Sequence, residues 1–438
     1  MNRRTGSAPS AQKTIALVGT FDTKGEEYAF VKRIVEAKGL KTLLIDTGVF
    51  GSPDHGCPRS PALGGLEDTS LAPDVTAEEV ARAAGETLAT LAARRDRGRA
   101  VEAMGRGLAE ILPRLHGEGR FQGVLALGGG GGTSIATRGM RALPIGVPKV
   151  MVSTMAGRDV SGFVGVKDVV MIPSLVDIEG LNRLTRGVLA RAAGAVCGMV
   201  QTGPPAAEER KLVAATMFGN TTPAVKRAAA LLEEAGYEVL VFPCSGTSGR
   251  VMETLIAEGR IAGVLDITTT EWADELVGGV LSAGPERLEA AARSSVPQVV
   301  APGCLDMVNF WAPDTVPERF RGRRFYEHNP NVTLMRTTPE ENRELGRIIA
   351  SKLNAGRGQT CVLLPLGGLS MLDRPGGPFW WPEADEALFG SLKEHLRKDI
   401  DIVEIDRNIN DGVFADACAE RLLAMLEKPT PNTEETHD

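Results

Sequence analysis

The stretch GEGRFQGVLALGGGGGT, residues 117–133, is the clearest indicator of how this chain folds. Its apolar run ends in five consecutive glycines, Gly128 to Gly132, and a helix-like run begins at Thr133. Nearly continuous apolar residues that end at glycine are typical of a parallel strand buried on both faces. We therefore predict a strand over residues 121–128 that leads through the glycines into a helix.

Similar strands flank this stretch on both sides. The nearest predicted strands are TIALVGT (14–20), KTLLIDTG (41–48) and VPKVMVST (147–154). Between them, apolar residues recur at helical spacing over residues 25–39 and 101–119, and both runs stop at glycine. Alternating strands and helices with short connections predict an α/β fold with a doubly wound, mostly parallel sheet.

The second half of the chain repeats this plan. Residues 117–133 align with AEGRIAGVLDITTTEWA (257–273), and VPKVMV (147–152) aligns with VPQVVA (296–301). The repeat predicts two tandem Rossmann-like domains, although two α/β halves can also align by chance. The predicted organisation is a disordered arm (1–12), a first domain (13–203), a Pro-rich linker (204–211), a second domain (212–427) and a disordered tail (428–438).

Composition narrows the class of protein. A chain of 438 residues is long enough for two domains. Its net charge of −7 argues against a nucleic-acid partner, because phosphate backbones favour basic surfaces. The chain shows no apolar run long enough to span a membrane and no signal-peptide pattern, and its six cysteines are scattered without a C-x-x-C pair. We expect a cytoplasmic protein with reduced thiols, no membrane association and no zinc site.

The loop after the first predicted strand, GTFDTKGEE (19–27), carries groups suited to phosphate and cations. Gly19 permits a sharp turn, Asp22 can cap the next helix or hold a cation, and Lys24 can contact a phosphate near that helix N-terminus. Asp46 ends the second strand, where an acid that binds ribose is often found. The candidate ligands here are Gly19, Thr20, Asp22, Thr23, Lys24 and Asp46.

The five glycines form the second candidate loop. They allow backbone N–H groups to point at an anion, and Thr133 opens a helix whose dipole favours negative charge. The loop is neither a Walker A motif nor G-x-G-x-x-G, so the pattern predicts phosphate binding in general. The alternative is that the glycines only permit tight packing of strand and helix. The segment 153–159 ends the next strand and would border the same cleft.

The chain resembles the ATP-binding domain family named for the tomato mosaic virus resistance protein. The strings that carry this resemblance are GTFDTKGEE, GGGGGTS, GVPKVMVSTMAG, GLNRLTRGVLARAAGAVCGM, TTTEWADELVGGVLSAGPERLEAAA, DMVNFWAPDTVPERF, HNPNVTLMRTTPEEN and PGGPFW, spread over residues 13–425. The resemblance implies two Rossmann-like domains, ATP on the first, and a homodimer. The nucleotide-binding residues that it implies are Gly19, Thr20, Asp22, Thr23, Lys24, Gly129, Gly130, Gly131, Gly132, Thr133, Ser153 and Thr154.

In the second domain the counterpart of the glycine loop is DITTTEWADE (266–275). It cannot hold a pyrophosphate by its backbone alone, but its side chains can hydrogen-bond a hydroxylated or carboxylated small molecule. HNPNVTLMRTT (328–338) is another polar segment expected at a strand end. The predicted substrate-binding residues are Thr268, Thr269, Thr270, Glu271 and Asn329.

Three further residues are the catalytic candidates. His328 can act as a general base, Arg336 can fix a carboxylate or phosphate, and Asp306 follows a predicted strand. The alternatives remain that His328 stabilises a turn beside Asn-Pro and that Asp306 caps a helix. Trp380 and Trp381 lie in a Pro/Gly-rich connection and indicate a buried flap or a subunit contact.

These observations give two functional hypotheses. The first is an ATP-binding cytosolic enzyme of small-molecule metabolism. ATP and Mg²⁺ would occupy the first domain, and a substrate derived from an organic acid or sugar would occupy the second-domain or interdomain cleft. The second is a nucleotide-dependent regulatory or protein-binding module without turnover, because the chain has no recognised kinase or ligase residue set.

Overall fold

The computed structural model describes residues 12–50, 71–203 and 209–427. The chain divides into two compact units, residues 1–206 and 207–438, and the division falls within the segment expected to be the linker. The predicted arm and tail lie outside the described residues, apart from Gln12. Each unit is described by itself below.

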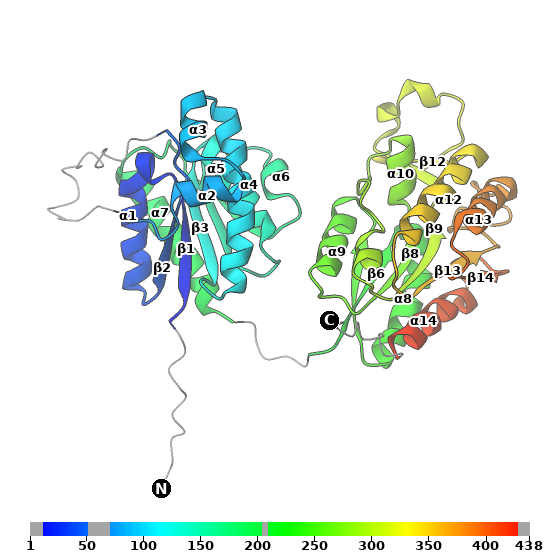
Figure 1. The fold of residues 1–438 in the computed structure, drawn as a ribbon. Coiled ribbons are helices and arrows are strands. Elements are labelled where there is room, and N and C mark those ends of the chain that lie inside the picture. The colour runs from blue at the N-terminus through cyan, green and yellow to red at the C-terminus, as the bar shows by residue number, and fades with distance from the viewer. Residues whose placement is uncertain (1–11, 51–70, 204–208, 428–438) are drawn as a thin grey trace, which may run out of the picture. The chain divides into compact units, whose positions relative to one another are not determined.

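The first unit is a five-stranded parallel sheet with helices on both faces (Figure 1). The strands, in the order β2-β1-β3-β4-β5, are β1 (Thr14–Gly19), β2 (Lys41–Asp46), β3 (Gly123–Gly128), β4 (Lys149–Ser153) and β5 (Val169–Pro173). The helices are α1 (Phe21–Ala37), α2 (Ala77–Ala83), α3 (Leu88–Arg94), α4 (Arg97–Gly117), α5 (Gly130–Ala142), α6 (Ser161–Val164) and α7 (Arg183–Gln201).

Alternation along the strands explains why both faces of this sheet are covered. In β1, Ile15 and Leu17 pack into the core formed with α1 and α7. Ala16 and Val18 point the other way, into the core formed with α2, α3, α4 and α5. Successive strand side chains face opposite sides, so a strand that is apolar throughout needs helices on both sides.

The second unit is built on a six-stranded parallel sheet, with strands in the order β14-β13-β9-β8-β6-β7. These strands are β6 (Leu212–Met217), β7 (Glu238–Pro243), β8 (Gly263–Thr268), β9 (Gln298–Gly303), β13 (Thr360–Pro365) and β14 (Asp401–Ile405). A smaller antiparallel sheet, ordered β10-β12-β11, contains β10 (Met307–Phe310), β11 (Phe325–Asn329) and β12 (Val332–Arg336).

The helices of the second unit also cover both faces of its large sheet. On one face α8 (Thr222–Glu234) and α14 (Gly412–Leu426) pack against the strands. On the other face lie α9 (Thr247–Ala257), α10 (Glu271–Val277), α11 (Ala290–Arg293), α12 (Pro339–Asn354) and α13 (Pro382–His395). Local signals set their ends. For example, Thr338 and Glu341 form a capping box before α12, with Pro339 in its first turn.

The two parallel sheets confirm the predicted fold class of tandem Rossmann-like α/β domains. The strand order β2-β1-β3-β4 of the first sheet recurs as β7-β6-β8-β9 in the second, as the internal repeat indicates. In each sheet the first strand pairs with a neighbour on either side. The β1/β3 and β6/β8 boundaries are therefore topological switch points, where loops diverge and ligands of open α/β sheets bind.

One local expectation needs correction. The five glycines do not form a loop between strand and helix. Gly128 is the last residue of β3, Gly129 is the N-cap, and Gly130 to Gly132 form the first turn of α5. Glycine weakens a helix by about 1 kcal/mol per residue relative to alanine, so packing of α5 against α4 and β3 stabilises this turn.

Candidate functional site

Tyr28 closes the first switch point, between β1 and β3. The pairing of β1 with β3 ends at Val18 and Ala126, and beyond it the buried Tyr28 hydroxyl lies between the strands. It donates to the Val18 carbonyl and accepts from the Leu127 N–H at 2.8 Å, and burial raises its pKa. A Cβ on Gly19 would lie 1.9 Å from the Tyr28 oxygen. Close packing against Tyr28 therefore requires glycine at position 19.

The N-terminus of α5, which directly follows β3, is open to solvent. Gly130 is exposed and Gly129, Gly131 and Gly132 are partly exposed. Among the described residues, the N–H groups of Gly130 to Gly132 have no hydrogen-bond acceptor. Unsatisfied N–H groups and the helix dipole make such a terminus favourable for an anion. Gly128 permits the close approach, because its Cβ would lie 2.9 Å from the Gly132 Cα.

Two residues expected to bind the nucleotide instead join α5 to β4. The Thr133 and Ser153 hydroxyls are buried and 2.6 Å apart, and the Ser153 oxygen also accepts from the Met155 N–H at 2.9 Å. They are not available as ligands in this structure, which corrects that prediction. Thr154 is exposed, and its Oγ1 would lie 3.8 Å from a Cβ on Gly129. Thr154 therefore borders the open helix end as expected.

The start of α1 provides hydroxyl groups at the same edge of the sheet. The Thr20 and Thr23 hydroxyls lie 2.8 Å apart in an exposed pair. Lys24 interrupts the helix with φ −130° and ψ 28°, and its ammonium donates to the Ile178 carbonyl. The Lys24 side chain thus anchors the segment between β5 and α7 in this structure.

Asp22 and Asp46 lie close together where α1 begins and β2 ends. Asp46 Oδ1 accepts from the N–H groups of Phe21 (3.2 Å) and Gly48 (2.9 Å). Burial raises the pKa of Asp46, and the charge of Asp22 raises it further. A Cβ on Gly48 would lie 2.7 Å from the Asp22 carboxyl carbon. Two neighbouring carboxyl groups can accept from ribose hydroxyls or bind a Mg²⁺ that keeps several waters. In the described part of the chain, no cluster of three or more His, Cys, Asp or Glu forms a metal site.

Arg97 is the site residue that sequence reasoning missed. It is exposed at the start of α4, and its Nη2 would lie 3.8 Å from a Cβ on Gly131. Its guanidinium is thus beside the first turn of α5, where it suits a phosphate. The sequence signal for it is the arginine-rich stretch RRDRGRA (94–100), which by itself is equally typical of a solvent-exposed helix.

The second switch point is filled by a buried ion cluster. Arg287 donates twice to Asp266, at 2.6 and 2.7 Å, and once to Glu271 at 2.8 Å. The Thr216 hydroxyl donates to Asp266 at 2.7 Å and accepts from the Thr268 N–H at 3.0 Å. All five residues are 1% exposed or less. Side chains therefore occupy the position that the glycines leave open in the first unit.

This arrangement corrects the prediction that Thr268, Thr269, Thr270 and Glu271 bind substrate. The Thr268 hydroxyl lies 2.7 Å from that of Thr221, and Thr269 donates to the Ala301 carbonyl at 3.2 Å. Thr270 accepts from the Asn309 amide at 3.4 Å, and Glu271 accepts from the Gly246 N–H at 2.8 Å. Their polar atoms are therefore paired with other groups inside the domain.

A cavity of about 280 Å³ lies beside this switch point, at the carboxyl end of β6 and against β10 and the β11–β12 hairpin. Its aromatic wall consists of Phe218, Phe310 and Trp311. The polar groups of its lining are Asn220, Asn309, His328 and Asn329. The structure therefore brings the predicted residues His328 and Asn329 together at one pocket, and both are exposed.

Asp306 and Arg336, the other catalytic candidates, lie in a buried cluster and do not line this pocket. Arg336 donates to Asp385 at 2.7 Å and to the Phe379 carbonyl at 2.8 Å. Asp306 accepts from Ser370 at 2.8 Å. Burial raises the pKa of Asp306 to about 7 and that of Asp385 to about 9, in both cases with a contribution from the charge of Asp373. The predicted catalytic trio is not assembled, because the fold uses two of its members internally.

The paired tryptophans are held against β11 by one arginine. The Arg324 guanidinium lies 5.1 Å from the ring centroid of Trp381 and donates to the Trp380 carbonyl at 3.2 Å. Both tryptophans are partly buried. The connection that carries the two tryptophans is thus anchored beside β11 by a cation–π contact and a hydrogen bond.

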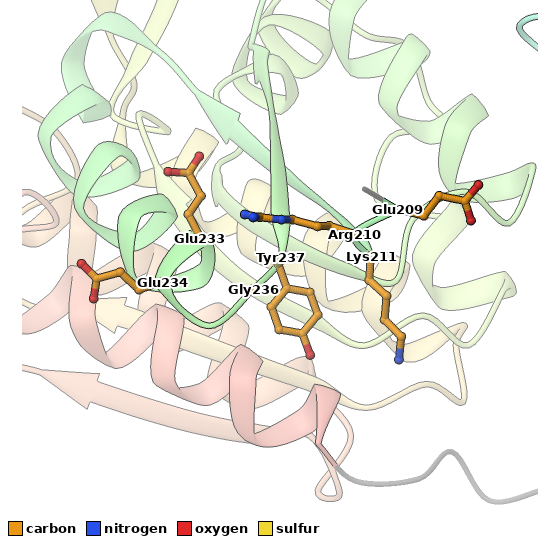
Figure 2. Close-up of a pocket in the computed structure, with 7 residues that line it drawn as sticks. All are labelled: Glu209, Arg210, Lys211, Glu233, Glu234, Gly236 and Tyr237. Carbon is orange, nitrogen blue, oxygen red and sulfur yellow. The ribbon is translucent and has the colours of Figure 1, made fainter. Parts of the chain in front are cut away.

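A larger hollow, of about 490 Å³, lies at the amino ends of β6 and β7. Figure 2 shows its charged side chains pointing in different directions instead of converging on one point. Its lining consists of Glu209, Arg210, Lys211, Glu233, Glu234, Gly236 and Tyr237. Open α/β sheets bind ligands at the carboxyl ends of their strands, so this opposite end is not the candidate site.

These features define a protein of two α/β domains, each with a candidate ligand edge, one suited to anions and one largely apolar. The chain belongs to the uncharacterised protein family UPF0261, whose N-terminal domain matches residues 13–205 and whose C-terminal domain matches residues 210–426. In the described parts of the chain, no helix combines the length and apolar character that crossing a bilayer requires.

Similar proteins occur in bacteria and in tomato. A UPF0261 protein of Clostridium tetani is 50% identical over 95% of this chain and all of its own length. A UPF0261 protein of Rhizobium meliloti is 46% identical over 92% of this chain and 97% of its own. The ToMV resistance protein Tm-1(GCR237) of Solanum lycopersicum is 36% identical over 96% of this chain, which spans 57% of that protein. The expected relationship to the tomato family is thereby confirmed.

Among solved structures, UDP-N-acetylglucosamine 2-epimerase from Rickettsia bellii matches with 10% identity and a TM-score of 0.23, over 95% of this chain and 96% of the epimerase. A likeness of this level carries no functional argument.

Proposed function

We propose that the first unit binds ATP at the carboxyl edge of β1 and β3, with the triphosphate at the N-terminus of α5. The observation that carries this proposal is the set of solvent-accessible N–H groups of Gly130 to Gly132, which lie at a topological switch point. A helix N-terminus in that position is a favourable site for a phosphate in α/β folds.

The surrounding groups support a nucleotide with its cation. Arg97 is placed to neutralise phosphate charge, and the exposed Thr20 and Thr23 hydroxyls can donate to phosphate oxygens. Asp22 and Asp46 lie at the ends of neighbouring elements, where they would bind Mg²⁺ or the ribose. A triphosphate brings several negative charges, so the combination of one guanidinium, a helix dipole and a divalent cation is electrostatically reasonable.

In the second unit we propose that the 280 Å³ cavity holds a small organic substrate, which makes the protein an ATP-dependent cytosolic enzyme of small-molecule metabolism. His328 is the titratable side chain among the residues that line this cavity, and it is the candidate for proton transfer. Self-association as a homodimer is part of this proposal, and sedimentation equilibrium of the full chain tests it.

A nucleotide-dependent regulatory module is the second candidate. The observation that favours it is the burial of Asp306 and Arg336, which leaves His328 without a catalytic partner from the predicted set. The names of the two tomato relatives refer to resistance and susceptibility to a virus, not to a reaction. In this alternative, bound ATP would stabilise one conformation that a partner protein recognises.

Calorimetric titration of the full chain with Mg²⁺–ATP tests the first-unit site. Gly130→Val should weaken binding at least about tenfold, or 1.4 kcal/mol, because its side chain would cover the helix terminus. A Cβ at Gly130 would meet only the Met155 sulfur at 3.9 Å, so the change should not disturb the fold. Gly162→Val, at an exposed glycine with open space around it, is the control. Unchanged affinity in Gly130→Val would overturn the site.

Lys24→Ala separates a phosphate contact from an anchoring role. We expect it also to weaken ATP binding about tenfold if the ammonium exchanges the Ile178 carbonyl for a phosphate when ATP binds.

Measurement of ATP turnover with and without candidate organic acids and neutral compounds distinguishes the two functions. Tight ATP binding without turnover in any mixture would favour the regulatory module.

A further inference from the structure

We propose that the 280 Å³ pocket of the second unit selects a neutral planar ring that carries an N–H donor, such as an aromatic amide or a small heteroaromatic ring, and discriminates against carboxylates and phosphates. This inference rests on the proposed substrate site of the second unit and names its ligand class.

The charge of the pocket is the first argument. No lysine, arginine, aspartate or glutamate belongs to its described lining, and His328 is its titratable member. Directly behind the lining, the buried carboxyl of Asp274 accepts from the Asn309 backbone N–H at 2.6 Å and from its side-chain amide at 2.7 Å. An anionic ligand would lose its hydration without gaining a lysine or arginine partner. A neutral ligand avoids this cost.

Asn309 provides the specific acceptor. The Asn309 backbone N–H donates to one oxygen of Asp274, and the side-chain amide nitrogen of Asn309 faces the other oxygen and donates to it. The Asn309 Oδ1 atom is consequently turned away from Asp274. It has no hydrogen-bond partner among the described residues, although the residue is 1% exposed and lines the pocket. Buried acceptors are normally satisfied, and leaving one unpaired costs about 1–3 kcal/mol. The oxygen has almost no accessible surface in this structure, so a ligand N–H would satisfy it only by displacing the side chains that cover it.

The shape of the pocket favours a ring. Phe218, Phe310 and Trp311 supply aromatic surfaces from the end of β6 and from β10, and Val332 and Leu334 add apolar surface from β12. The Trp311 side chain is 52% exposed, so its ring is accessible to a ligand in the pocket. Aromatic side chains stack with planar rings, and a cavity of this size limits the ligand to one or two rings.

Three matched probes test the ligand class on the full chain. Benzamide is planar and neutral with an N–H donor, benzoate has the same ring with a negative charge, and N,N-dimethylbenzamide is neutral without the donor. Ligand-observed NMR reports binding, and intrinsic tryptophan fluorescence, to which Trp311 contributes, follows it as a second readout. We expect benzamide to bind about tenfold tighter than benzoate and severalfold tighter than N,N-dimethylbenzamide. Equal or tighter binding of benzoate, or no saturable binding of benzamide, would overturn the proposal.

A blocking variant places the binding in this pocket. A Cβ on Gly219 meets no atom within 4 Å, and Gly219 lines the pocket, so Gly219→Leu adds a side chain at the pocket without a clash. It should weaken benzamide binding at least about tenfold. Gly390→Leu is the matched control, because Gly390 is an exposed glycine of α13 with equally open surroundings. Equal benzamide affinity in Gly219→Leu and wild type would locate the binding elsewhere and refute the proposal.

The same variants separate this inference from the proposed function. Gly219→Leu should bind Mg²⁺–ATP like the wild type, because the proposed nucleotide site belongs to the first unit. If ATP does not bind at all while the benzamide pattern holds, the proposed function fails and the ligand class stands. If ATP binds as proposed but benzoate is preferred to benzamide, the ligand class alone fails.

Discussion

The same strand order occurs at the β1/β3 edge of the first unit and the β6/β8 edge of the second, but the side chains at the two edges differ in kind. At the first edge, small residues leave the N-terminus of α5 open. In the internal repeat the corresponding positions are Thr268 to Trp272, whose side chains are buried. The comparison shows that topology provides the place where a ligand can bind, whereas the side chains at that place decide which ligand chemistry is possible.

The two edges solve the same backbone problem in different ways. Where the central strands diverge, N–H and carbonyl groups lose their partners and need substitutes. The Tyr28 hydroxyl supplies them between β1 and β3. Between β6 and β8 the Thr216 hydroxyl accepts from the Thr268 N–H, and the Thr268 hydroxyl donates to the Thr216 carbonyl. The Thr216 hydroxyl also donates to Asp266, which belongs to the Arg287 cluster. The arrangement at the β6/β8 edge buries charged side chains, whereas the Tyr28 bridge at the β1/β3 edge does not.

The largest expected effect comes from breaking the ion cluster. Arg287→Met should destabilise the second unit by about 3–5 kcal/mol, because it leaves Asp266 and Glu271 buried without their cation. Urea unfolding measures the loss, and hydrogen exchange should locate it in residues 209–427. Arg227→Met is the control, since the Arg227–Asp416 pair is exposed and its loss should change stability far less. Similar losses in both variants would contradict the role assigned to burial.

The stability of the second unit should fall as pH rises from about 4 to 7 because of Asp306. The folded-state pKa of Asp306, about 7, is above its ordinary value of 3.8. The contribution of Asp306 to the free energy of unfolding is therefore fully present below about pH 4. It is lost as pH rises to about 7, by at most about 1.4 kcal/mol per pH unit, because one proton is involved. Asp306→Asn should flatten this decline, as urea unfolding at a series of pH values will show. An unchanged slope in the variant would assign the dependence to other groups.

Removing the hydroxyl groups at the two switch points should have similar effects in the two units. Tyr28→Phe leaves the Leu127 N–H and the Val18 carbonyl without this partner, and Thr216→Val does the same to the Thr268 N–H. Each substitution should lower the free energy of unfolding by about 1–3 kcal/mol, because it leaves a buried polar group without a hydrogen bond. Urea unfolding with hydrogen exchange assigns each loss to its unit. A neutral result in one variant would show that its strands close without the bridge.

Placing the glutamate of the second edge at the equivalent glycine of the first edge should make the first edge unfavourable for an anion. The repeat aligns Gly131 with Glu271, so Gly131→Glu places a carboxylate at the first turn of α5. We expect ATP affinity to fall at least about tenfold, 1.4 kcal/mol, through charge repulsion. Gly131→Gln shares the contact with Val101, 3.3 Å from the added Cβ, and isolates the charge. Equal losses in the two variants would indicate crowding instead of electrostatics.

The smallest expected effect concerns Arg97. Arg97→Gln should weaken ATP binding severalfold, by less than about 1 kcal/mol, because the guanidinium is exposed and screened by solvent. The loss should shrink as salt concentration rises, and calorimetry at low and high salt checks this. A salt-independent loss would indicate that Arg97 acts through packing.

The prediction of the candidate sites from sequence was uneven for a physical reason. Glycines before a helix indicate an open terminus from local sequence alone, so Gly130 to Gly132 could be found. Thr268 and Glu271 have the residue types of ligands, but their partners Thr221 and Arg287 are distant in the chain. Whether a hydroxyl or carboxyl faces solvent or another side chain depends on those partners, which no local pattern reveals.

The sequence by itself determined the parallel strands, the helices between them, the internal repeat and the positions of both carboxyl edges. Apolar periodicity and glycine act within a few residues, so they can be interpreted along the chain. Only the tertiary structure decided that Arg336 is internal, that Arg97 lies beside α5, and that His328 shares a pocket with Asn309. These relations depend on desolvation and on contacts between residues far apart in sequence, which exist only once the domains have folded.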